Sequence, residues 1–479
     1  PCCGMTHRFI SVVQSSVDVG DPHICSDSMN RGNIIDSIYE PLASRVGPGV
    51  YSPTLASSWA VEPDGLTWLF KLRESVRFHN GEKLTGNDVV ATLKRVVDPA
   101  IGGAFGTQGT YASYIGDAEF TSPSKYSFQI ATKEPMADLL DLLSEMPIAP
   151  EDELGNIPNE YIGTGPYQVG GISRDEFVME SNRKYWGGRK AIADEASWLK
   201  EDDAVERAEM VANREADIAT SIGLEGTKSL AGSTRAKQYS IKSSLCIIFM
   251  MNCGTGVCTD ASVRQALNYG LDIDAVIKEV KKGAATRLNG YMNPHHFGHN
   301  PETKVYPYDP DHARKLLAEA GYGDGMKLTI DIPTRMPDEG LAVGDMMKEH
   351  YGKIGVDVEV VSYADRAAYA EMVRDKVIHD MCCFDSSPIS TFRVLREKIH
   401  SGHKGPWWEG FHNEEVNGLI DKAQRTFDDN ARESIYKQVF QVIRDEAPWV
   451  FLYRPTYFWA INKKLGDWTP TKRGQVKLV

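Results

Sequence analysis

Apolar and polar positions along this chain follow two periods, and the balance between them changes near the middle. Before residue 240 most patterns are short. His7–Val13 and Trp68–Leu72 are strand-like, the second with alternating apolar and polar positions. Asn80-Gly81, which ends Arg77–Gly81, is a strong hairpin turn signal. Thr85–Val96 has apolar residues at helical spacing behind a threonine that can cap the first turn, which predicts a helix.

From about residue 260 onward, predicted helices and strands alternate. Helices are expected at Ala261–Val280, Asp311–Ala320, Leu341–Ile354 and Ala431–Asp445, and strands at Lys327–Ile332 and Val356–Ser362. This alternation favours a mostly parallel sheet with helices on both faces. Two long apolar strands, Ile241–Asn252 and Trp449–Ile461, frame the region. If the last strand returned to the first domain, one lobe would be discontinuous and the two crossovers could act as a hinge.

Length and charge narrow the class of protein. A chain of 479 residues exceeds one hydrophobic core, so two or three domains are expected. Its 53 lysines and arginines against 66 aspartates and glutamates give a net charge of −13, which disfavours binding to nucleic acid or anionic membrane. No apolar stretch approaches the roughly 20 residues of a membrane span. The chain opens at Pro1 without a visible export signal, so it is either cytosolic or the mature form of an exported protein.

The eight cysteines lack the recurring paired spacing of a structural metal site. Cys253 and Cys258 flank a short glycine-containing loop and could form a disulfide, which would suit an oxidising compartment. Two buried free thiols are the alternative. Cys382-Cys383 lies in an apolar run and is expected to pack in a core.

Sequence signatures of enzymes are absent. There is no phosphate-binding loop, no H-E-x-x-H and no G-x-S-x-G. His295-His296 and the pair His400 and His403 have no carboxylate or cysteine beside them, so we interpret them as solvated loop residues. We therefore expect a protein that is not an enzyme and has no metal or cofactor.

Several motifs recur in the order and spacing of one known family. They are Tyr39–Leu42, Leu55–Trp59, Pro63–Arg73, Val76–Gly81, Leu84–Val90, Gly163–Tyr167, Asn182–Trp186, Val263–Tyr269, Tyr308–Pro310, Ala320–Tyr322 and His412-Asn413. In these motifs the chain resembles the extracellular solute-binding proteins that include the dipeptide, oligopeptide and nickel receptors of ABC importers. Most of the motifs contain turn residues and large apolar anchors, so they specify a scaffold and leave the ligand open.

The resemblance implies an α/β fold like that of periplasmic binding proteins, with two lobes joined by a hinge and an extra domain inserted in the first lobe. The expected core domain of lobe 1 comprises residues 1–38, 163–250 and 458–479, the inserted domain 39–162, and lobe 2 residues 251–457. It also implies a monomeric periplasmic protein whose lobes close over a small-molecule ligand. The expected partners are the membrane permease subunits of an ABC importer, without nucleic acid.

In this family a cleft segment often reads Gly-Asp-x-x-Asp-Pro, and the second Asp of peptide receptors pairs with the ligand's amino group. Here Asp385 matches the first acid, but Pro388 stands at the second, which argues against ordinary peptide binding. The segment offers hydroxyl groups and a cation instead: Ser386, Ser387, Ser390 and Arg393. This chemistry suits phosphate, carboxylate or polyol groups and resembles receptors for opines of the sugar-phosphate type. The alternative is that Ser386 and Ser390 only cap a helix and Arg393 is a surface residue.

Trp407-Trp408, in a loop rich in glycine and proline, is a second candidate, because one ring could stack on a sugar or line the cleft. Asn252, at the end of a hinge strand, is a third. The leading hypothesis is a binding protein for a small polar solute, such as an opine or sugar-phosphate conjugate. The alternatives are a peptide receptor of the same family, a periplasmic hydrolase of glycosides or esters, and a sensor or chaperone-like protein with this fold.

Overall fold

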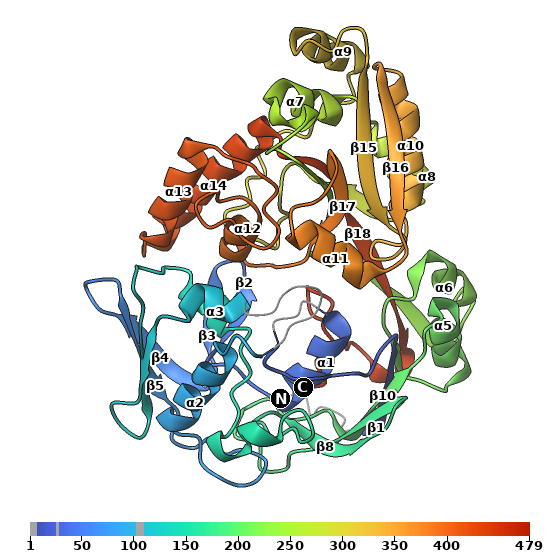
Figure 1. Ribbon diagram of the computed structural model, residues 1–479. Helices are drawn as coiled ribbons and strands as arrows, with labels where there is room; N and C mark the ends of the chain where they lie inside the picture. The colour runs from blue at the N-terminus through green and yellow to red at the C-terminus, as the bar shows by residue number, and fades with distance from the viewer. Residues whose placement is uncertain (1–6, 25–27, 102–109) are drawn as a thin grey trace. The chain divides into compact units, whose positions relative to one another are not determined.

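The computed structural model describes residues 7–24, 28–101 and 110–479, which form two compact units (Figure 1). Unit 1 contains the chain up to Val46, then Val50–Ile241 and Tyr457–Val479, and unit 2 contains Gly47–Gly49 and Lys242–Thr456. The long connections therefore pass between the units after Ile241 and after Thr456. The borders implied by the family resemblance, 250/251 and 457/458, stay predictions. The division of the first lobe at 38/39 and 162/163 stays a prediction.

Unit 1 is built around a mixed sheet. Its strands are β1 (His7–Gln14), β8 (Tyr167–Ile172), β9 (Glu176–Ser181), β10 (Ala193–Lys200), β11 (Ile218–Ala219), β12 (Ala236–Lys242) and the C-terminal part of β18 (Trp449–Asn462). β1 lies between β10 and β11 and is parallel to both, whereas β8, β9 and β18 join antiparallel. Because side chains of a strand alternate between faces, Val12 packs toward α1 (Met29–Ile38) and Val13 toward α5 (Ala204–Asn213) and α6 (Gly223–Ser229).

A second, antiparallel sheet of unit 1 supports an extra domain, as the sequence predicts. Its strand order is β4-β5-β7-β6, and a separate hairpin pairs β2 with β3. The bounds are β2 (Ala43–Gly47), β3 (Val50–Pro53), β4 (Ala56–Val61), β5 (Thr67–Leu72), β6 (Glu119–Thr121), β7 (Ser127–Ala131), α2 (Gly86–Val96), α3 (Thr110–Ile115) and α4 (Leu139–Leu143). The amide and hydroxyl of Thr85 both donate to Asp88 at 2.8 Å, and this capping box starts α2 where the sequence predicts.

Glu40 joins three of the motifs that carry the family resemblance. Its carboxylate is buried and accepts hydrogen bonds from Thr164 Oγ1 at 2.8 Å, Trp186 Nε1 at 2.8 Å and Tyr185 OH at 2.6 Å. Burial raises the pKa of Glu40, and these three donors oppose the rise. The motifs that contain these residues therefore hold the scaffold of unit 1 together.

His79 and the Gly163–Gly165 segment show the same structural role. The ring accepts the Gly163 amide at Nδ1 (3.2 Å), so Nε2 carries the proton and donates to the Gly165 carbonyl at 3.0 Å. A Cβ at Gly163 would lie 2.1 Å from the Ile38 carbonyl oxygen, so only glycine fits there. The motif that contains Gly163 is thus required for close backbone packing.

Unit 2 contains a sheet in the order β16-β15-β17-β13-β18, with β14 paired to β18. The strands are β13 (Cys246–Met251), β14 (Ala285–Arg287), β15 (Met326–Pro333), β16 (Val356–Tyr363) and β17 (Met381–Ser386). The helices are α7 (Ala261–Tyr269), α8 (Ile273–Glu279), α9 (Pro310–Glu319), α10 (Gly340–Gly352), α11 (Arg366–Arg374), α12 (Thr391–Lys398), α13 (Glu414–Gln424) and α14 (Asp429–Glu446). A short 3-10 turn lies at Val257–Thr259, and unit 1 contains two more at Glu151–Asn156 and Lys463–Leu465.

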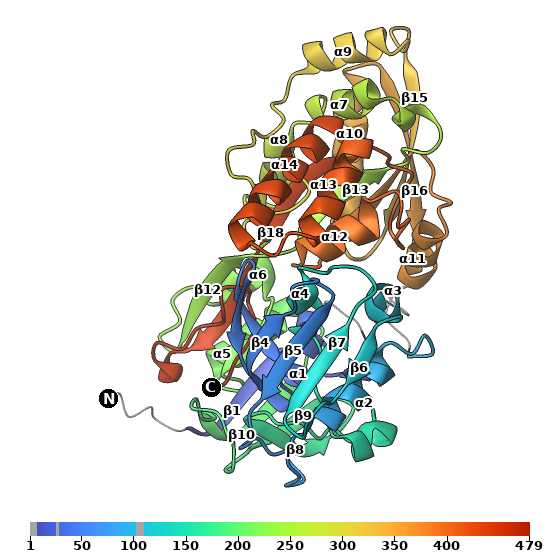
Figure 2. The same cartoon turned by 90° about the vertical axis from the view of Figure 1, so that its left-hand side faces the viewer.

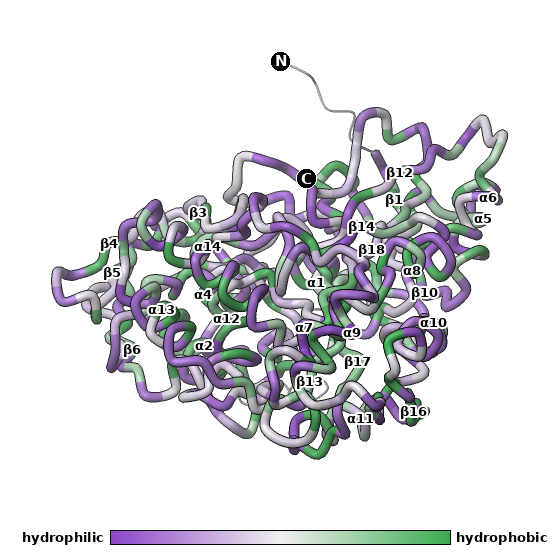
Figure 3. The backbone as a smooth tube through the Cα atoms, turned by 90° about the horizontal axis from the view of Figure 1, so that it is seen from above, coloured by the Kyte–Doolittle hydropathy of each residue, from purple (hydrophilic) through white to green (hydrophobic). Residues whose placement is uncertain are grey.

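Helices cover both faces of this sheet. Residues of α11–α14 pack with Ile248 and Met250 on one face, and residues of α7–α10 pack with Ile247 and Phe249 on the other. β13 is therefore buried on both sides, and Figure 3 shows its hydrophobic colouring and that of β17. Figure 2 shows α13 and α14 lying side by side on their face of unit 2.

The structure corrects three sequence predictions in unit 2. The sheet is not mostly parallel, because only β15, β16 and β17 run parallel, and β13 and β18, which carry the chain between the units in opposite directions, pair antiparallel. The helix expected over Ala261–Val280 is two helices, since α7 ends at Gly270 and Asp272 caps α8. The strand expected over Ile241–Asn252 is interrupted at Ser243–Leu245. Among the described residues, no helix is long and apolar enough to cross a membrane.

Candidate functional site

The carboxyl ends of the three parallel strands of unit 2 form one edge of the sheet. Ile330 of β15 pairs with Met381 of β17, and Pro333 of β15 pairs with Tyr363 of β16. The Thr334 amide also donates to the Tyr363 carbonyl at 2.9 Å, and Arg335 follows directly after it. Open α/β sheets bind ligands at the carboxyl edge of parallel strands, so this edge is the candidate site.

Arg366, the first residue of α11, connects two parts of this edge. Its Nη2 lies 3.9 Å from Asp385 Oδ1, and its Nε donates to the Met336 carbonyl at 3.3 Å. The guanidinium carbon also lies 5.5 Å from the ring centroids of both Tyr369 and Phe384. Figure 1 shows α11 at this end of the strands. Arg366 was not among the residues predicted from the sequence to contact the ligand, although its place directly after a predicted parallel strand was a usable signal.

Asp385 therefore already faces a cation of its own chain. The segment that follows it is anchored by the buried His296, whose Nε2 lies 2.9 Å from the Pro388 carbonyl oxygen. Ser387 is half-buried between these two positions. The acid–proline segment is thus built into unit 2, with Arg366 and Asp385 at its accessible start.

The serines of this segment have different surroundings. Ser390 caps α12, since its Oγ accepts the amide of Arg393 at 3.1 Å, as the structural alternative predicts. Ser386 is fully buried at the end of β17, where it pairs with Cys246 of β13, and no hydrogen-bond partner of its Oγ is found among the described residues. Burial raises the pKa of the Cys246 thiol to about 12, so this neighbour is an uncharged thiol at neutral pH.

Arg393 is not a surface residue. Only 1% of it is exposed, and its Nε lies 3.0 Å from Glu397 Oε1 one turn along α12. Lys398 Nζ lies 4.0 Å from the other Glu397 oxygen and 6.0 Å from the Phe384 ring centroid, on the ring that Arg366 also contacts. Cations of α11 and α12 therefore meet around Phe384, next to Asp385.

The two adjacent tryptophans have different surroundings. Trp407 is buried, with its ring centroid 4.9 Å from that of Phe384, so it joins the core beneath the Asp385 segment. Trp408 is half-buried and donates from Nε1 to the Phe411 carbonyl at 2.6 Å. Next to them, burial raises the pKa of Glu409 to about 8. Trp408 is thus the more accessible ring of the pair.

Asn252 lies elsewhere in unit 2. In the β13–β17 ladder Ile247 pairs with Asp385, whereas Asn252 follows Met251, which pairs with Met381 at the other end of β17. Its Nδ2 donates to the His379 carbonyl at 3.1 Å, and its Oδ1 accepts the amides of the next turn. The structure does not bring Asn252 to the other candidate residues, and gives its side chain a role in closing a turn.

The sequence left a disulfide and two free thiols open for Cys253 and Cys258, and in the structure both thiols are free. Cys258 is fully buried in the core beside α7, and burial raises the pKa of both thiols. Cys382 and Cys383 pack on opposite faces of the sheet, as the core interpretation predicts. Cys258 is shielded from solvent by apolar packing, whereas Cys253 is half-buried.

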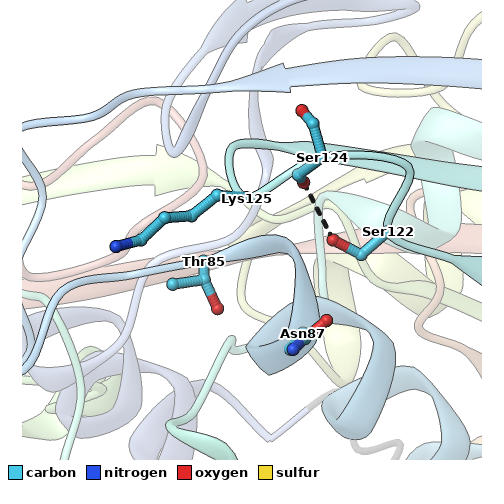
Figure 4. Close-up of a pocket in the computed structure, with 5 residues that line it drawn as sticks. All are labelled: Thr85, Asn87, Ser122, Ser124 and Lys125. Carbon is cyan, nitrogen blue, oxygen red and sulfur yellow. Dashed lines mark hydrogen bonds between the residues drawn. The ribbon is translucent and has the colours of Figure 1, made fainter.

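A pocket of about 410 Å³ lies in unit 1, between the start of α2 and the β6–β7 turn (Figure 4). It is lined by Thr85, Asn87, Ser122, Ser124 and Lys125. Asn87, Ser124 and Lys125 are exposed, and the capping box already occupies the start of the helix. We therefore assign the candidate site to the carboxyl edge in unit 2.

Comparison with known proteins supports the fold and the class of solute-binding protein that the sequence predicts. Residues 50–388 match the family described as bacterial extracellular solute-binding proteins, family 5. A curated relative, the glutathione-binding protein GsiB of Shigella dysenteriae serotype 1, is 26% identical over 98% of this chain and 93% of its own.

Solved structures share the fold over almost the whole chain. The periplasmic binding protein DppA of Helicobacter pylori, in complex with the peptide STSA, has a TM-score of 0.77 at 23% identity and covers 96% of this chain and 95% of its own. The binding protein AgaA of A. tumefaciens R10, in complex with agropinic acid, has a TM-score of 0.77 at 20% identity, covering 95% and 93%. Because the family match spans more than half of the sequence, the chain belongs to the family 5 extracellular solute-binding proteins and serves an ABC importer as a binding protein, not as an enzyme.

Proposed function

We propose that this protein is a periplasmic receptor that captures a small anionic solute and delivers it to the permease subunits of an ABC importer. The solute class that fits best is an opine or sugar-phosphate conjugate, whose carboxylate or phosphate is held at the carboxyl edge of unit 2. This extends the family assignment to a ligand chemistry.

The observation that carries the proposal is the pairing of Asp385 with Arg366 at 3.9 Å. In a peptide receptor an acid of this segment is needed for the ligand's ammonium group, but here Asp385 faces a guanidinium and the second position is Pro388. Arg335 is exposed and lies two residues after the end of β15, so a second guanidinium is accessible near the carboxyl end of a parallel strand. Guanidinium groups bind carboxylate and phosphate in bidentate geometry.

Two relatives support an acidic, amino-acid-derived ligand. AgaA was solved with agropinic acid, and GsiB is described as a glutathione-binding protein. We carry this to the present chain as part of the proposal, because both compounds bear carboxylates that an arginine edge can hold.

The first test is mass spectrometry of small molecules released when the purified protein is denatured, followed by calorimetric titration of the compounds found. Without a released compound, an opine, a sugar phosphate, glutathione and a neutral dipeptide are titrated directly. Arg335→Ala is expected to weaken binding of an anionic solute by about 1.5–3 kcal/mol, the range for a hydrogen bond to a charged group. Arg314→Ala, an exposed arginine on α9, is the matched control and is expected to leave affinity unchanged.

The competing candidate within the family is a peptide receptor. It is favoured if the dipeptide binds and the anionic compounds do not, in which case the interpretation of Pro388 is wrong. Equal affinity of wild-type protein and Arg335→Ala for the released compound would remove the proposed anion contact while leaving the family assignment intact.

A further inference from the structure

Two histidines and an aspartate meet at the turn between α12 and α13. His400 Nε2 lies 3.2 Å from Asp421 Oδ1, and the rings of His400 and His403 have centroids 4.4 Å apart. One ligand atom from each of these three residues lies within 4.8 Å of the others. The sequence predicted His400 and His403 to be solvated loop residues because no carboxylate stood beside them, but the fold supplies Asp421 from the next helix.

The turn is fixed to α13 by a second set of hydrogen bonds. The Ser401 amide donates to Asn417 Oδ1 at 3.2 Å, and Asn417 Nδ2 donates to Ser401 Oγ at 2.7 Å. Asn417 and Asp421 are four residues apart on one helix, so they share a face. The contacts that anchor the turn therefore also hold His400 and His403 in front of Asp421.

Burial within the cluster is graded. His400 is buried, whereas His403 and Asp421 are exposed. An ion from solvent can therefore reach the three ligand atoms, and its remaining coordination positions would face water. Imidazole nitrogen with one carboxylate oxygen is a ligand set that suits Zn²⁺ and Ni²⁺ and disfavours Mg²⁺, which prefers oxygen ligands.

We propose that His400, His403 and Asp421 form a binding site for a divalent transition-metal ion such as Zn²⁺ or Ni²⁺. The site belongs wholly to unit 2 and uses none of the residues assigned to the solute. It is independent of the proposed ligand class.

One hydrogen bond must change when the ion binds. His400 Nδ1 accepts the Gly402 amide at 3.0 Å, so the proton of the neutral ring is on Nε2 and points at Asp421. An ion bound at Nε2 takes the place of that proton, and the ring then carries its proton on Nδ1. Gly402 is exposed, so its amide can turn to water within the loop. The rearrangement is confined to the residues between His400 and His403.

The test is calorimetric titration of chelator-treated full-length protein with ZnCl₂ and NiCl₂, and with MgCl₂ as the negative control. One equivalent of Zn²⁺ or Ni²⁺ per chain is expected. His403→Ala and Asp421→Asn are each expected to weaken this binding at least about tenfold, the range seen when even supporting groups of metal sites are lost. The matched control is His379→Ala, because His379 also pairs with an aspartate, Asp331, at 2.7 Å but has no second histidine there.

Each outcome decides the proposal. Weakened binding in His403→Ala and Asp421→Asn, with wild-type affinity in His379→Ala, supports the site. Wild-type affinity in both ligand variants, or no heat from the wild-type protein with either metal, overturns it. Circular dichroism of each variant shows whether the fold is intact, and solute titration of the same variants separates failure of this site from failure of the proposed function.

Discussion

Replacing Arg393 by alanine decides whether this side chain belongs to the scaffold or to the solute site. Arg393 is 1% exposed and Glu397 is 5% exposed, and their charged groups are 3.0 Å apart within α12. Removing one partner of a buried ion pair leaves the other charge without compensation, which costs about 3–5 kcal/mol. Because Lys398 Nζ remains 4.0 Å from the other carboxylate oxygen, we expect the lower end, about 3 kcal/mol.

The reasoning is tested by urea denaturation of Arg393→Ala and of the double variant Arg393→Met/Glu397→Met. If the stability lost in Arg393→Ala comes from the Glu397 carboxylate that has lost its arginine, the double variant should recover most of that stability. Replacing a buried ion pair by apolar groups of similar volume often leaves the free energy of unfolding unchanged. Calorimetry with the identified solute is run in parallel. We expect the affinity of Arg393→Ala to change by less than about twofold, since the guanidinium is used inside the helix.

The opposite pattern would refute this interpretation. A loss of stability below about 1 kcal/mol, together with a drop in affinity of tenfold or more, would mean that Arg393 serves the solute. In that case Arg393 would pair with Glu397 only in the absence of the solute, and the solute would replace Glu397 as its partner. The hypothesis drawn from the sequence, in which Arg393 contacts an anionic group, would then be supported.

Three further predictions concern the scaffold. Glu40→Ala should lower the free energy of unfolding by about 2–4 kcal/mol, because three hydrogen bonds worth about 0.5–1.5 kcal/mol each are lost. Glu40→Gln should lower it by only about 1 kcal/mol or less. Equal losses of stability for the two variants in urea titrations would contradict this prediction. Burial lowers the pKa of His79 from 6.5 to about 4. The neutral ring therefore contributes up to about 3 kcal/mol of stability, which is complete above about pH 6.5 and is lost as the pH falls toward 4. The free energy of unfolding, measured against pH, should fall less steeply over this range in His79→Gln. Cys258, which is buried, should react with a thiol reagent only after denaturation. The absence of both Cys253 and Cys258 from the thiol titration of denatured, unreduced protein would mean that a disulfide forms after all.

Most elements could be predicted because their signals are local. The period of α14 and the capping threonine of α2 act within a few residues of each helix, and the structure confirms both. The prediction of one helix over Ala261–Val280 was wrong, because the chain breaks at Gly270 and a new helix starts at the capping Asp272. The spacing of apolar residues does not indicate this break. Strand direction was also out of reach, since pairing depends on where distant strands return.

In the candidate site too, local features could be predicted from the sequence and contacts between distant residues could not. The segment from Asp385 to Arg393 could be found from its sequence, and Ser390 proved to be the helix cap that one alternative predicted. The place of Arg366 after a strand was visible in the sequence, but its pairing with Asp385 was not, because their distance results from the register of β16, β15 and β17. Asp421 was missed for a similar reason, since it meets His400 only when α13 folds back beside the turn.

These cases explain why the chain reveals its class more readily than its ligand. The family motifs join in contacts such as Glu40 with Thr164, Tyr185 and Trp186, which any member needs in order to fold. Ligand chemistry depends instead on single residues placed at the strand ends, where an arginine can neutralise an acid without changing the scaffold. The pairing of Arg366 with Asp385 is a feature of this kind, because it gives the acid of this segment a cation from the chain itself. A receptor can thus retain every structural motif of its family while its solute differs in charge.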